Sequence, residues 1–328
     1  MHRRALPAIP PSCAVPRLRL PRPRSDVRLL AAWLACALAL RADTASPKRE
    51  LLTCGRERVH IVDLNARDAQ GAPKIIWTWQ AAGRVDLPAE YHALFRSTDE
   101  CKPVDGGRRI LITSSSGAVA LVERATGAVV FYGRAVNAHS ADLLPGGRIA
   151  VAASRDPKEN KGDALILFDL ARPAEELGRI ELPSGHGVVW DAQRQVVWAL
   201  SDKEIHRHRL VDWQASQPKL ERVASHALPE GGGHDLYPVP GTAMLSITTA
   251  NRCWLFNRDT AAISPHPELS GRANIKCISE HPVTHQIAFT EAERPNWWTT
   301  RIRFLRPDDS VSVGSEQFYK VRWNVAAE

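Results

Sequence analysis

From about residue 46 onward, hydrophobic and polar residues alternate in short runs, and helical periodicity is nearly absent. Runs such as ELLTCG, VHIVDL, RILITSS and ALILFDL are rich in β-branched and aliphatic residues. Gly, Pro, Asp and Asn bound these runs, which is typical of short strands joined by tight turns. The pattern therefore predicts a single all-β domain over residues 46–328.

The strands recur in a longer repeat. Five segments align on their second strand: DECKPVDGGRRILITSS (99–115), HSADLLPGGRIAVAAS (139–154), HGVVWDAQRQVVWALS (186–201), HDLYPVPGTAMLSITT (234–249) and KCISEHPVTHQIAFTE (276–291). Each begins with an inner strand and a tight turn, and third and fourth strands usually follow. Their first residues are 40, 47, 48 and 42 positions apart. Four strands per unit of this length is the repeat of a β-propeller.

Residues 50–80 contain only a second, a third and a fourth strand. FYKVRWN, from Phe318 to Asn324, is predicted to supply the missing first strand. A C-terminal strand in that place closes the ring and leaves no free sheet edge. We therefore expect six four-stranded blades, or seven if residues 82–98 contain strands. A β-sandwich would explain neither the repeat nor the isolated last strand.

The alignment places chemically active residues at one repeated position. The first residues of the inner strands are Asp99, His139, His186, His234, Lys276 and, by a looser alignment, Lys320. Inner strands line the channel of a propeller, so these residues are predicted to form a ring at one end of it. Three roles stay open. Neutral imidazoles can bind a divalent transition metal, act in acid–base chemistry on an anionic substrate, or only bond backbone groups and plug the channel.

Neighbouring residues extend these roles. Asp142 and Asp235 follow His139 and His234 closely and are predicted to fix the tautomers of the imidazoles. Asp235 can equally cap the turn that follows it.

Further residues flank the inner strands. Arg96, Tyr319 and Arg322 are predicted to reach the end of the channel. The NWW run at 296–298 could stack on sugars, although Trp between blades is more often part of the core. The sequence contains no GxSxG, Walker loop, HExxH or dinucleotide fingerprint.

The N-terminal segment differs from the rest in composition. Residues 1–45 carry eight Arg and two Asp, and their apolar run extends from Leu29 to Leu40. This arrangement predicts a secretory signal peptide, because the run is shorter than the roughly 20 residues of a membrane span. An uncleaved membrane anchor is the alternative. We expect export to the periplasm or the extracellular space, with no membrane association once the leader is removed.

The net charge is also divided unevenly between the leader and the rest of the chain. The formal net charge is +7, and the leader accounts for nearly all of it. The propeller domain is therefore close to neutral, which argues against nucleic acid as a partner. We expect the protein to be a monomer.

The cysteines indicate the cellular compartment less clearly than the leader does. Outside the leader there are Cys54, Cys101, Cys253 and Cys277, an even number that fits an oxidising compartment. Three disulfide connectivities are open to four cysteines, and the sequence does not distinguish them. The absence of a CxxC pair argues against a zinc site built from thiolates.

The repeats resemble those of an uncharacterised family of exported bacterial β-propeller proteins, one of the domain-of-unknown-function groups. The resemblance covers Leu51 to Asn324 and rests on IIWTWQ, GGRRILITSSSG, AHSADLLPGGRIAVAAS, GHGVVWDAQRQVVWALSD, GGHDLYPV and FYKVRW. It implies the propeller fold and makes the three histidine segments features of the family, but it implies no activity.

At the level of fold alone, the chain is similar to propeller polysaccharide lyases, which act on uronate-containing glycans. That similarity implies β-elimination with a histidine base, a tyrosine acid, and a lysine, arginine or bound metal that neutralises the uronate carboxylate. The catalytic residues would be His139, His186, His234, Tyr319 and Lys320, and the substrate-binding residues Asp99, Lys276, Arg322 and Arg96. A propeller that binds a glycan, peptide or metal without turnover, or an interaction scaffold, is the alternative.

Overall fold

The computed structural model describes residues 48–158 and 161–325. The predicted leader, residues 1–45, lies outside the described residues. Within the described part of the chain, no helix combines the length and the hydrophobicity needed to cross a membrane.

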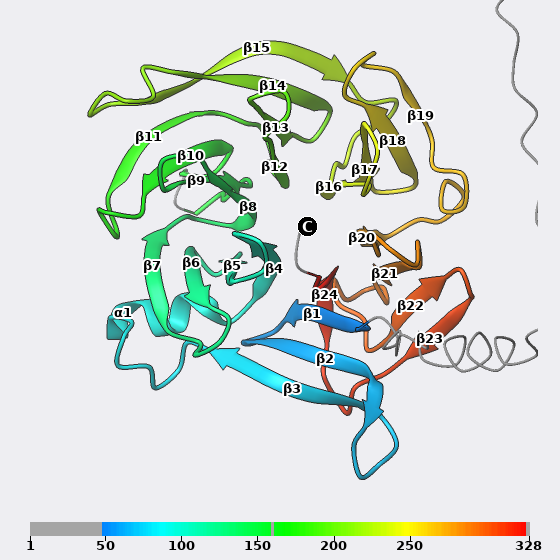
Figure 1. The fold of residues 1–328 in the computed structure, drawn as a ribbon. Coiled ribbons are helices and arrows are strands. Elements are labelled where there is room, and N and C mark those ends of the chain that lie inside the picture. Colours follow the sequence, from blue (N-terminus) through cyan, green and yellow to red (C-terminus); the bar gives the residue numbers. More distant parts are fainter. Residues whose placement is uncertain (1–47, 159–160, 326–328) are drawn as a thin grey trace, which may run out of the picture. The chain divides into compact units, whose positions relative to one another are not determined.

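The strands form six antiparallel sheets of four strands each, arranged as blades around a central channel (Figure 1). From the channel outward, blade I consists of β24 (Phe318–Trp323), β1 (Glu50–Gly55), β2 (Arg58–Arg67) and β3 (Pro73–Gln80). Blade II consists of β4 (Thr98–Val104), β5 (Arg109–Ser114), β6 (Ala118–Glu123) and β7 (Val129–Arg134). Blade III consists of β8 (Ala138–Leu144), β9 (Arg148–Ala153), β10 (Ala164–Asp169) and β11 (Glu176–Glu181).

The other three blades follow in chain order. Blade IV consists of β12 (Gly187–Asp191), β13 (Val196–Leu200), β14 (Glu204–Val211) and β15 (Lys219–Ala227). Blade V consists of β16 (Asp235–Pro238), β17 (Met244–Thr248), β18 (Cys253–Asn257) and β19 (Ile263–Pro265). Blade VI consists of β20 (Ile275–Glu280), β21 (Ile287–Glu291), β22 (Ile302–Leu305) and β23 (Asp309–Val311).

The predicted six-bladed propeller is therefore confirmed. Residues 82–98 contribute no seventh blade, because they hold the short helix α1 (Ala89–His92), the 3-10 turn η1 (Ala93–Phe95) and only the first residue of β4.

The ring closes through its last strand, as predicted. β24 pairs antiparallel with β1, with Leu51 opposite Trp323 and Thr53 opposite Val321. Blade I thus combines the two ends of the described chain, and the channel side of β1 is paired with β24 instead of free. Such pairing removes the exposed strand edge at which two chains could associate.

The hydrophobic core lies between neighbouring blades. Phe131 of blade II meets Phe168 of blade III with ring centroids 5.7 Å apart, and Trp198 of blade IV meets Phe256 of blade V at 5.1 Å. Both contacts are edge-to-face, a favourable geometry for aromatic pairs. The middle strands of each blade are covered on both faces, which explains why the second strand of each repeat is the most hydrophobic.

The centre of the channel holds a buried cluster of four charged side chains: Glu100 on β4, Asp235 on β16, and Lys320 and Arg322 on β24. Each is at most 1% exposed. Arg322 donates two hydrogen bonds to Glu100, at 2.9 and 2.8 Å, and two to Asp235, at 2.9 and 2.6 Å. Lys320 Nζ lies 3.0 Å from Asp235 and 3.5 Å from Glu100. The last strand is therefore bonded to blades II and V at once.

The charges of this cluster balance, with two carboxylates and two cations. Burial by itself would raise the pKa of Glu100 and of Asp235, but Arg322 and Lys320 outweigh burial and hold both pKa values below their ordinary range. Both carboxylates are consequently ionised at neutral pH. A folded-state pKa below the unfolded value means that this stabilisation is present at neutral pH and is lost only as acid protonates the carboxylates.

Replacing Arg322 with methionine should destabilise the protein strongly, because two buried carboxylates would lose their main partner. Breaking a buried ion pair from one side costs about 3–5 kcal/mol. Arg209→Met is the matched control, since Arg209 makes a comparable two-oxygen contact with Glu221 on the exposed surface, where such pairs contribute at most about 1 kcal/mol. Denaturant unfolding of both variants measures the difference. Equal losses would show that the cluster does not hold the ring together.

Candidate functional site at the histidine end of the channel

Four of the six inner strands present one extra residue near their first end in the channel. In β4, β8, β20 and β24 the pairing with the neighbouring strand skips one residue, and the skipped residues are Asp99, His139, Lys276 and Tyr319. A β-bulge of this kind redirects a side chain and is common beside functional sites.

The other two inner strands carry a similar irregularity just before they begin. The backbone N–H of His186 bonds the Leu200 carbonyl at 3.0 Å, although Gly187 is the residue paired with Leu200. His234 relates to Thr248 in the same way, at 2.8 Å. The sequence repeat therefore coincides with a structural repeat. We call the six residues at this position, Asp99, His139, His186, His234, Lys276 and Tyr319, the histidine ring.

The sixth member of the histidine ring differs from the predicted one. The looser alignment named Lys320, but the bulge in β24 puts Tyr319 at this position and Lys320 one level deeper, in the buried ion cluster. A bulge shifts the side-chain direction by one residue. The bulge has no signature in FYKVRWN that could have shown this.

The three histidines stack on one another. The rings of His139 and His186 are 4.2 Å apart at 19°, and those of His186 and His234 are 5.1 Å apart at 26°. His186 Nδ1 lies 2.7 Å from the Ser184 carbonyl and His234 Nδ1 2.6 Å from the Gly232 carbonyl. A carbonyl only accepts hydrogen bonds, so Nδ1 carries the hydrogen in both rings and Nε2 is left with a lone pair.

Burial keeps the imidazoles of His186 and His234 neutral. It lowers the pKa of His186 well below the ordinary value, and His139 and His234 lower it further. Burial, followed by the nearby Lys276, lowers the pKa of His234 to about 3. At neutral pH both rings therefore offer Nε2 as a hydrogen-bond acceptor.

The glycine run before His234 has a steric reason. Gly232 has φ +83, a conformation that side-chain-bearing residues rarely adopt, and a Cβ on Gly233 would lie 2.5 Å from the Ser201 carbonyl oxygen. The run carries the chain from blade IV to blade V and presents the Gly232 carbonyl that orients the ring of His234.

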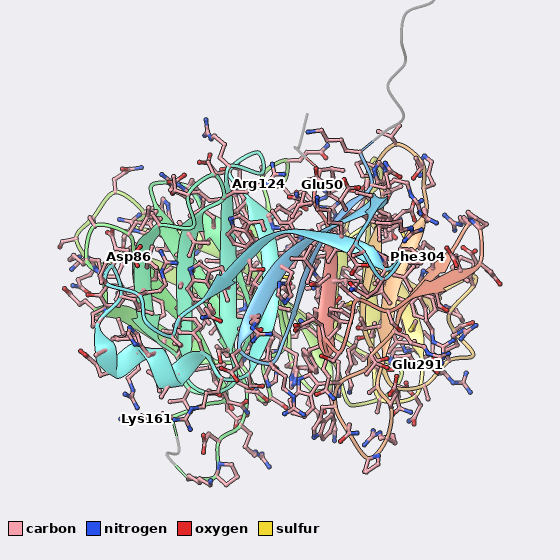
Figure 2. The ribbon with its side chains drawn as sticks, turned by 90° about the horizontal axis from the view of Figure 1, so that it is seen from below. Glu50, Asp86, Arg124, Lys161, Glu291 and Phe304 are labelled. Carbon is pink, nitrogen blue, oxygen red and sulfur yellow. The ribbon has the colours of Figure 1, made fainter. Side chains whose placement is uncertain are left out.

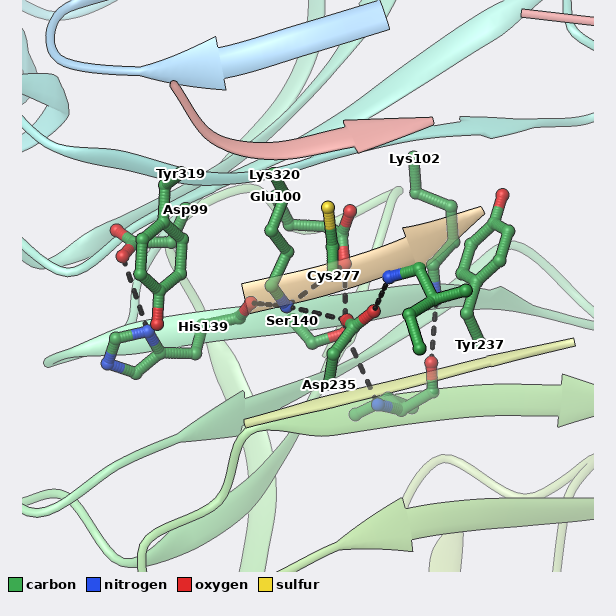
Figure 3. Close-up of polar contacts among 12 residues, drawn as sticks. Asp99, Glu100, Lys102, His139, Ser140, Asp235, Tyr237, Cys277, Tyr319 and Lys320 are labelled. Carbon is green, nitrogen blue, oxygen red and sulfur yellow. Dashed lines mark hydrogen bonds and ion pairs between the residues drawn. The ribbon is translucent and has the colours of Figure 1, made fainter. Parts of the chain in front are cut away.

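His139 faces a carboxylate. Its Nδ1 lies 3.3 Å from Asp99 Oδ1, while Asp99 Oδ2 accepts the backbone N–H of Ser115 at 2.5 Å. Figure 3 shows Tyr319 beside this pair, and its ring centroid is 6.0 Å from that of His139. Burial, reinforced by Asp99, raises the pKa of Tyr319 well above its ordinary value, so the phenol stays protonated. Asp99, predicted to bind substrate, thus lies beside His139 in the histidine ring.

Lys276 is a buried cation without a counter-ion. It is 2% exposed, and among the described residues its ammonium makes no hydrogen bond or ion pair. Its Nζ lies 4.6 Å from the centroid of the Trp297 ring. Burial, followed by Arg294 and Lys320, lowers the pKa of Lys276 to about 7. Anionic ligands are attracted to such a group, because they supply the charge that it lacks.

The predicted partners of the imidazoles have other roles. Asp142 accepts Lys102 Nζ at 3.3 Å and the N–H of Trp190 at 2.9 Å, and Asp235 belongs to the ion cluster. Neither fixes a histidine tautomer; the carbonyls of Ser184 and Gly232 do so.

Of the other predicted cations, two belong to the ion cluster and the third lies on the surface. Lys320 and Arg322 are fully buried in the ion cluster and cannot meet a substrate there. Arg96 is exposed at the end of η1.

The structure does not support the predicted metal site. Among the described residues, no group of three or more His, Cys, Asp or Glu side chains is placed to hold a metal ion. The imidazoles stack face to face, and backbone carbonyls engage Nδ1 of His186 and of His234.

The cysteines of the propeller are free. Cys54, Cys101, Cys253 and Cys277 are all buried thiols. Cys277 accepts the N–H of Val321 at 3.1 Å and so helps to join β20 to β24.

A cavity of about 770 Å³ lies at the opposite end of the channel, lined by Lys102, Asp142, Tyr237, Glu50 and Arg124 among others. Figure 2 shows Glu50 and Arg124 at that face and Lys161 at the other. The charges of this cavity are largely paired, Lys102 with Asp142 and Arg124 with Glu50. The unpaired Lys276 makes the histidine end the better chemical candidate.

Comparisons with known proteins agree with the fold. The chain matches the model of a family of unknown function, DUF6528, over residues 45–327. No curated protein matches it. Among solved structures, it is similar to a chain of the crystal structure of a nidogen/laminin complex, with a TM-score of 0.54 and 10% identity over 85% of this chain and 98% of that one. At that identity the likeness shows the propeller fold alone. Because the family model spans nearly the whole propeller, the chain belongs to the family of unknown function DUF6528.

Proposed function

We propose that the histidine end of the channel binds a uronate residue of an acidic glycan and cleaves the glycan by β-elimination. The observation that carries this proposal is Lys276, a buried ammonium with no counter-ion among the described residues, in a ring with two neutral imidazoles. A carboxylate that enters the ring would provide the missing charge. A charge-assisted hydrogen bond of this kind is about twice as strong as a neutral one.

The order of the blades suggests which residue of the histidine ring binds the carboxylate and which one acts as the base. Lys276 on blade VI is three blades from His139 on blade III, so the two side chains face one another across the ring. A uronate whose carboxylate contacts Lys276 would direct its adjacent carbon towards the centre of the ring. His139 is the proposed base, because Asp99 Oδ1 lies 3.3 Å from its Nδ1 and would stabilise the imidazolium that forms when His139 takes a proton.

The proposed step balances in atoms and electrons. His139 Nε2 takes the proton from the carbon next to the carboxylate, and the C–H electron pair forms a carbon–carbon double bond. The bond to the glycosidic oxygen breaks, and that oxygen receives a proton from the Tyr319 hydroxyl. Lys276 stabilises the charge that develops on the carboxylate, which is the electrostatic part of the catalysis.

A non-catalytic binding protein is the competing function, and one observation favours it. Tyr319, the proposed acid, is only 4% exposed. A binding protein would use the same ring to hold a uronate without cleaving it. Turnover therefore separates the two functions, while ligand binding alone does not.

Replacing His139 with alanine should abolish the cleavage of uronate-containing glycans while retaining most of the affinity for them. The assay follows the ultraviolet absorbance of the unsaturated uronate product from polygalacturonate, alginate and hyaluronan. Loss of a general base lowers the rate about 10²–10⁴-fold.

Lys276→Ala should weaken the binding of these glycans instead, with Lys219→Ala on the exposed β15 as control. Binding without turnover by the wild type would overturn the lyase activity, and absence of both would overturn the proposal as a whole.

Ligand affinity should fall as the pH rises through about 7. Lys276 is charged below its folded-state pKa of about 7 and neutral above it, while a uronate carboxylate is ionised throughout. Isothermal titration between pH 6 and pH 9, about one to two units on either side of that pKa, measures the change. Lys276→Arg is the matched control, because arginine keeps its charge in this range and should remove this part of the dependence. An identical pH profile in wild type and variant would contradict the role of Lys276.

A further inference from the structure

We propose that Trp297 and Arg294 form a second sugar subsite outside the histidine ring, so that the site takes an acidic oligosaccharide in preference to a single uronate. The inference rests on the proposed function, which places the first uronate against Lys276. It concerns the loop between β21 and β22, to which the sequence assigned no role beyond the NWW run.

Trp297 has an unusual position for a tryptophan. It is 48% exposed, whereas Trp79, Trp198 and Trp323 are at most 2% exposed. Its ring stacks on the imidazole of His234, with centroids 6.3 Å apart at 26°. The indole therefore continues the stack of histidines out of the ring towards solvent. An exposed aromatic surface next to polar groups is what the carbon-bound hydrogens of a sugar ring pack against.

Two cations border this indole. Lys276 Nζ lies 4.6 Å from the centroid of Trp297 and Arg294 Cζ 5.1 Å from it. Lys276 is buried in the ring and Arg294 is exposed on the loop. Arg294 uses Nε to bond Asn274 at 2.8 Å, and it forms no ion pair with a described carboxylate. Its terminal nitrogens are therefore available to a carboxylate, the group that a guanidinium binds with two parallel hydrogen bonds.

The loop is held in place before any ligand binds. Glu293 accepts the hydroxyl of Thr299 at 2.8 Å, and Thr299 exchanges two backbone hydrogen bonds with Phe318, at 3.0 and 2.8 Å. The guanidinium of Arg56 lies 3.9 Å from the ring of Trp298. These contacts tie the loop to blade I. A platform ordered in advance loses little entropy when a ligand binds.

The geometry determines the size of the ligand. A uronate that contacts Lys276 would lie within the histidine ring, and one that packs on Trp297 would lie outside it, because Lys276 is buried and Trp297 is 48% exposed. A ligand that contacts Lys276, Trp297 and Arg294 together therefore has at least two sugar units, and its second unit carries a carboxylate for Arg294.

The experiment measures the affinity of the full-length protein for a monosaccharide and a trisaccharide of whichever polymer it binds better, polygalacturonate or alginate, because every sugar of these polymers carries a carboxylate. In the wild type the trisaccharide should bind more tightly. Trp297→Ala should weaken trisaccharide binding about threefold to tenfold, as expected for one lost aromatic contact, and change monosaccharide binding less than twofold. Trp297→Phe should restore most of the loss. Arg294→Gln should weaken trisaccharide binding more than monosaccharide binding when affinities are measured at pH 6, about one unit below the pKa of Lys276, where Lys276 is largely protonated with or without Arg294.

Trp213→Ala is the matched control, because Trp213 also has an arginine over its ring, with Arg148 Cζ 4.6 Å away, and lies on a different blade. It should leave both affinities unchanged. If Trp297→Ala weakens the binding of both ligands equally, or of neither ligand, the proposal of a second subsite is overturned and the proposed function stands. If the wild type binds no uronate, the proposed function fails and the subsite fails with it.

Discussion

The pairing of Arg322 and Lys320 with Glu100 and Asp235 is the interaction on which the rest of the structure depends. The cations come from the last strand, and the carboxylates come from blades II and V on opposite sides of the channel. A buried charge without a partner costs several kcal/mol, so none of the four is stable in the channel without the others. Docking of β24, closure of the ring and neutralisation of the channel are therefore one event.

The same cluster separates the two ends of the channel. Its side chains are at most 1% exposed, so a ligand cannot pass from one end to the other. At the cavity end, Lys102 and Asp142 neutralise each other. At the histidine end, Lys276 has no counter-ion among the described residues. Lys320 also donates to the carbonyl of His139 at 3.1 Å, which couples the cluster to the position of the proposed base.

The predicted propeller and the observed one agree because the repeat depends on local chemistry. Strand-forming residues, Gly and Pro turns and the spacing of the segments are all visible along the chain, and each blade buries both faces of its sheet against its neighbours. The role of FYKVRW as the closing strand could also be predicted, because residues 50–80 lack a first strand. The convergence of His139, His186 and His234 could be anticipated for the same reason, since equivalent positions of a repeat meet at one level of the ring.

The roles of the surrounding side chains could not be anticipated, because they depend on contacts between residues far apart in sequence. Asp142 and Asp235 follow histidines in the chain, yet they pair with cations of other blades, and Asp99 reaches His139 from the preceding blade. The bulge in β24 places Tyr319 at the ring position for which Lys320 was predicted. No residue preference in the sequence indicates where this bulge lies.

The sequence by itself thus determined the propeller fold, the closing strand and the level of the histidines, because these follow from periodicity and strand count, while the structure showed that residues 82–98 add no seventh blade. Only the tertiary structure decided which charges neutralise one another and which remain unpaired. Solvation and pairing of a buried charge depend on the groups around it in space, and for Lys276 those groups are Trp297, Arg294 and Lys320.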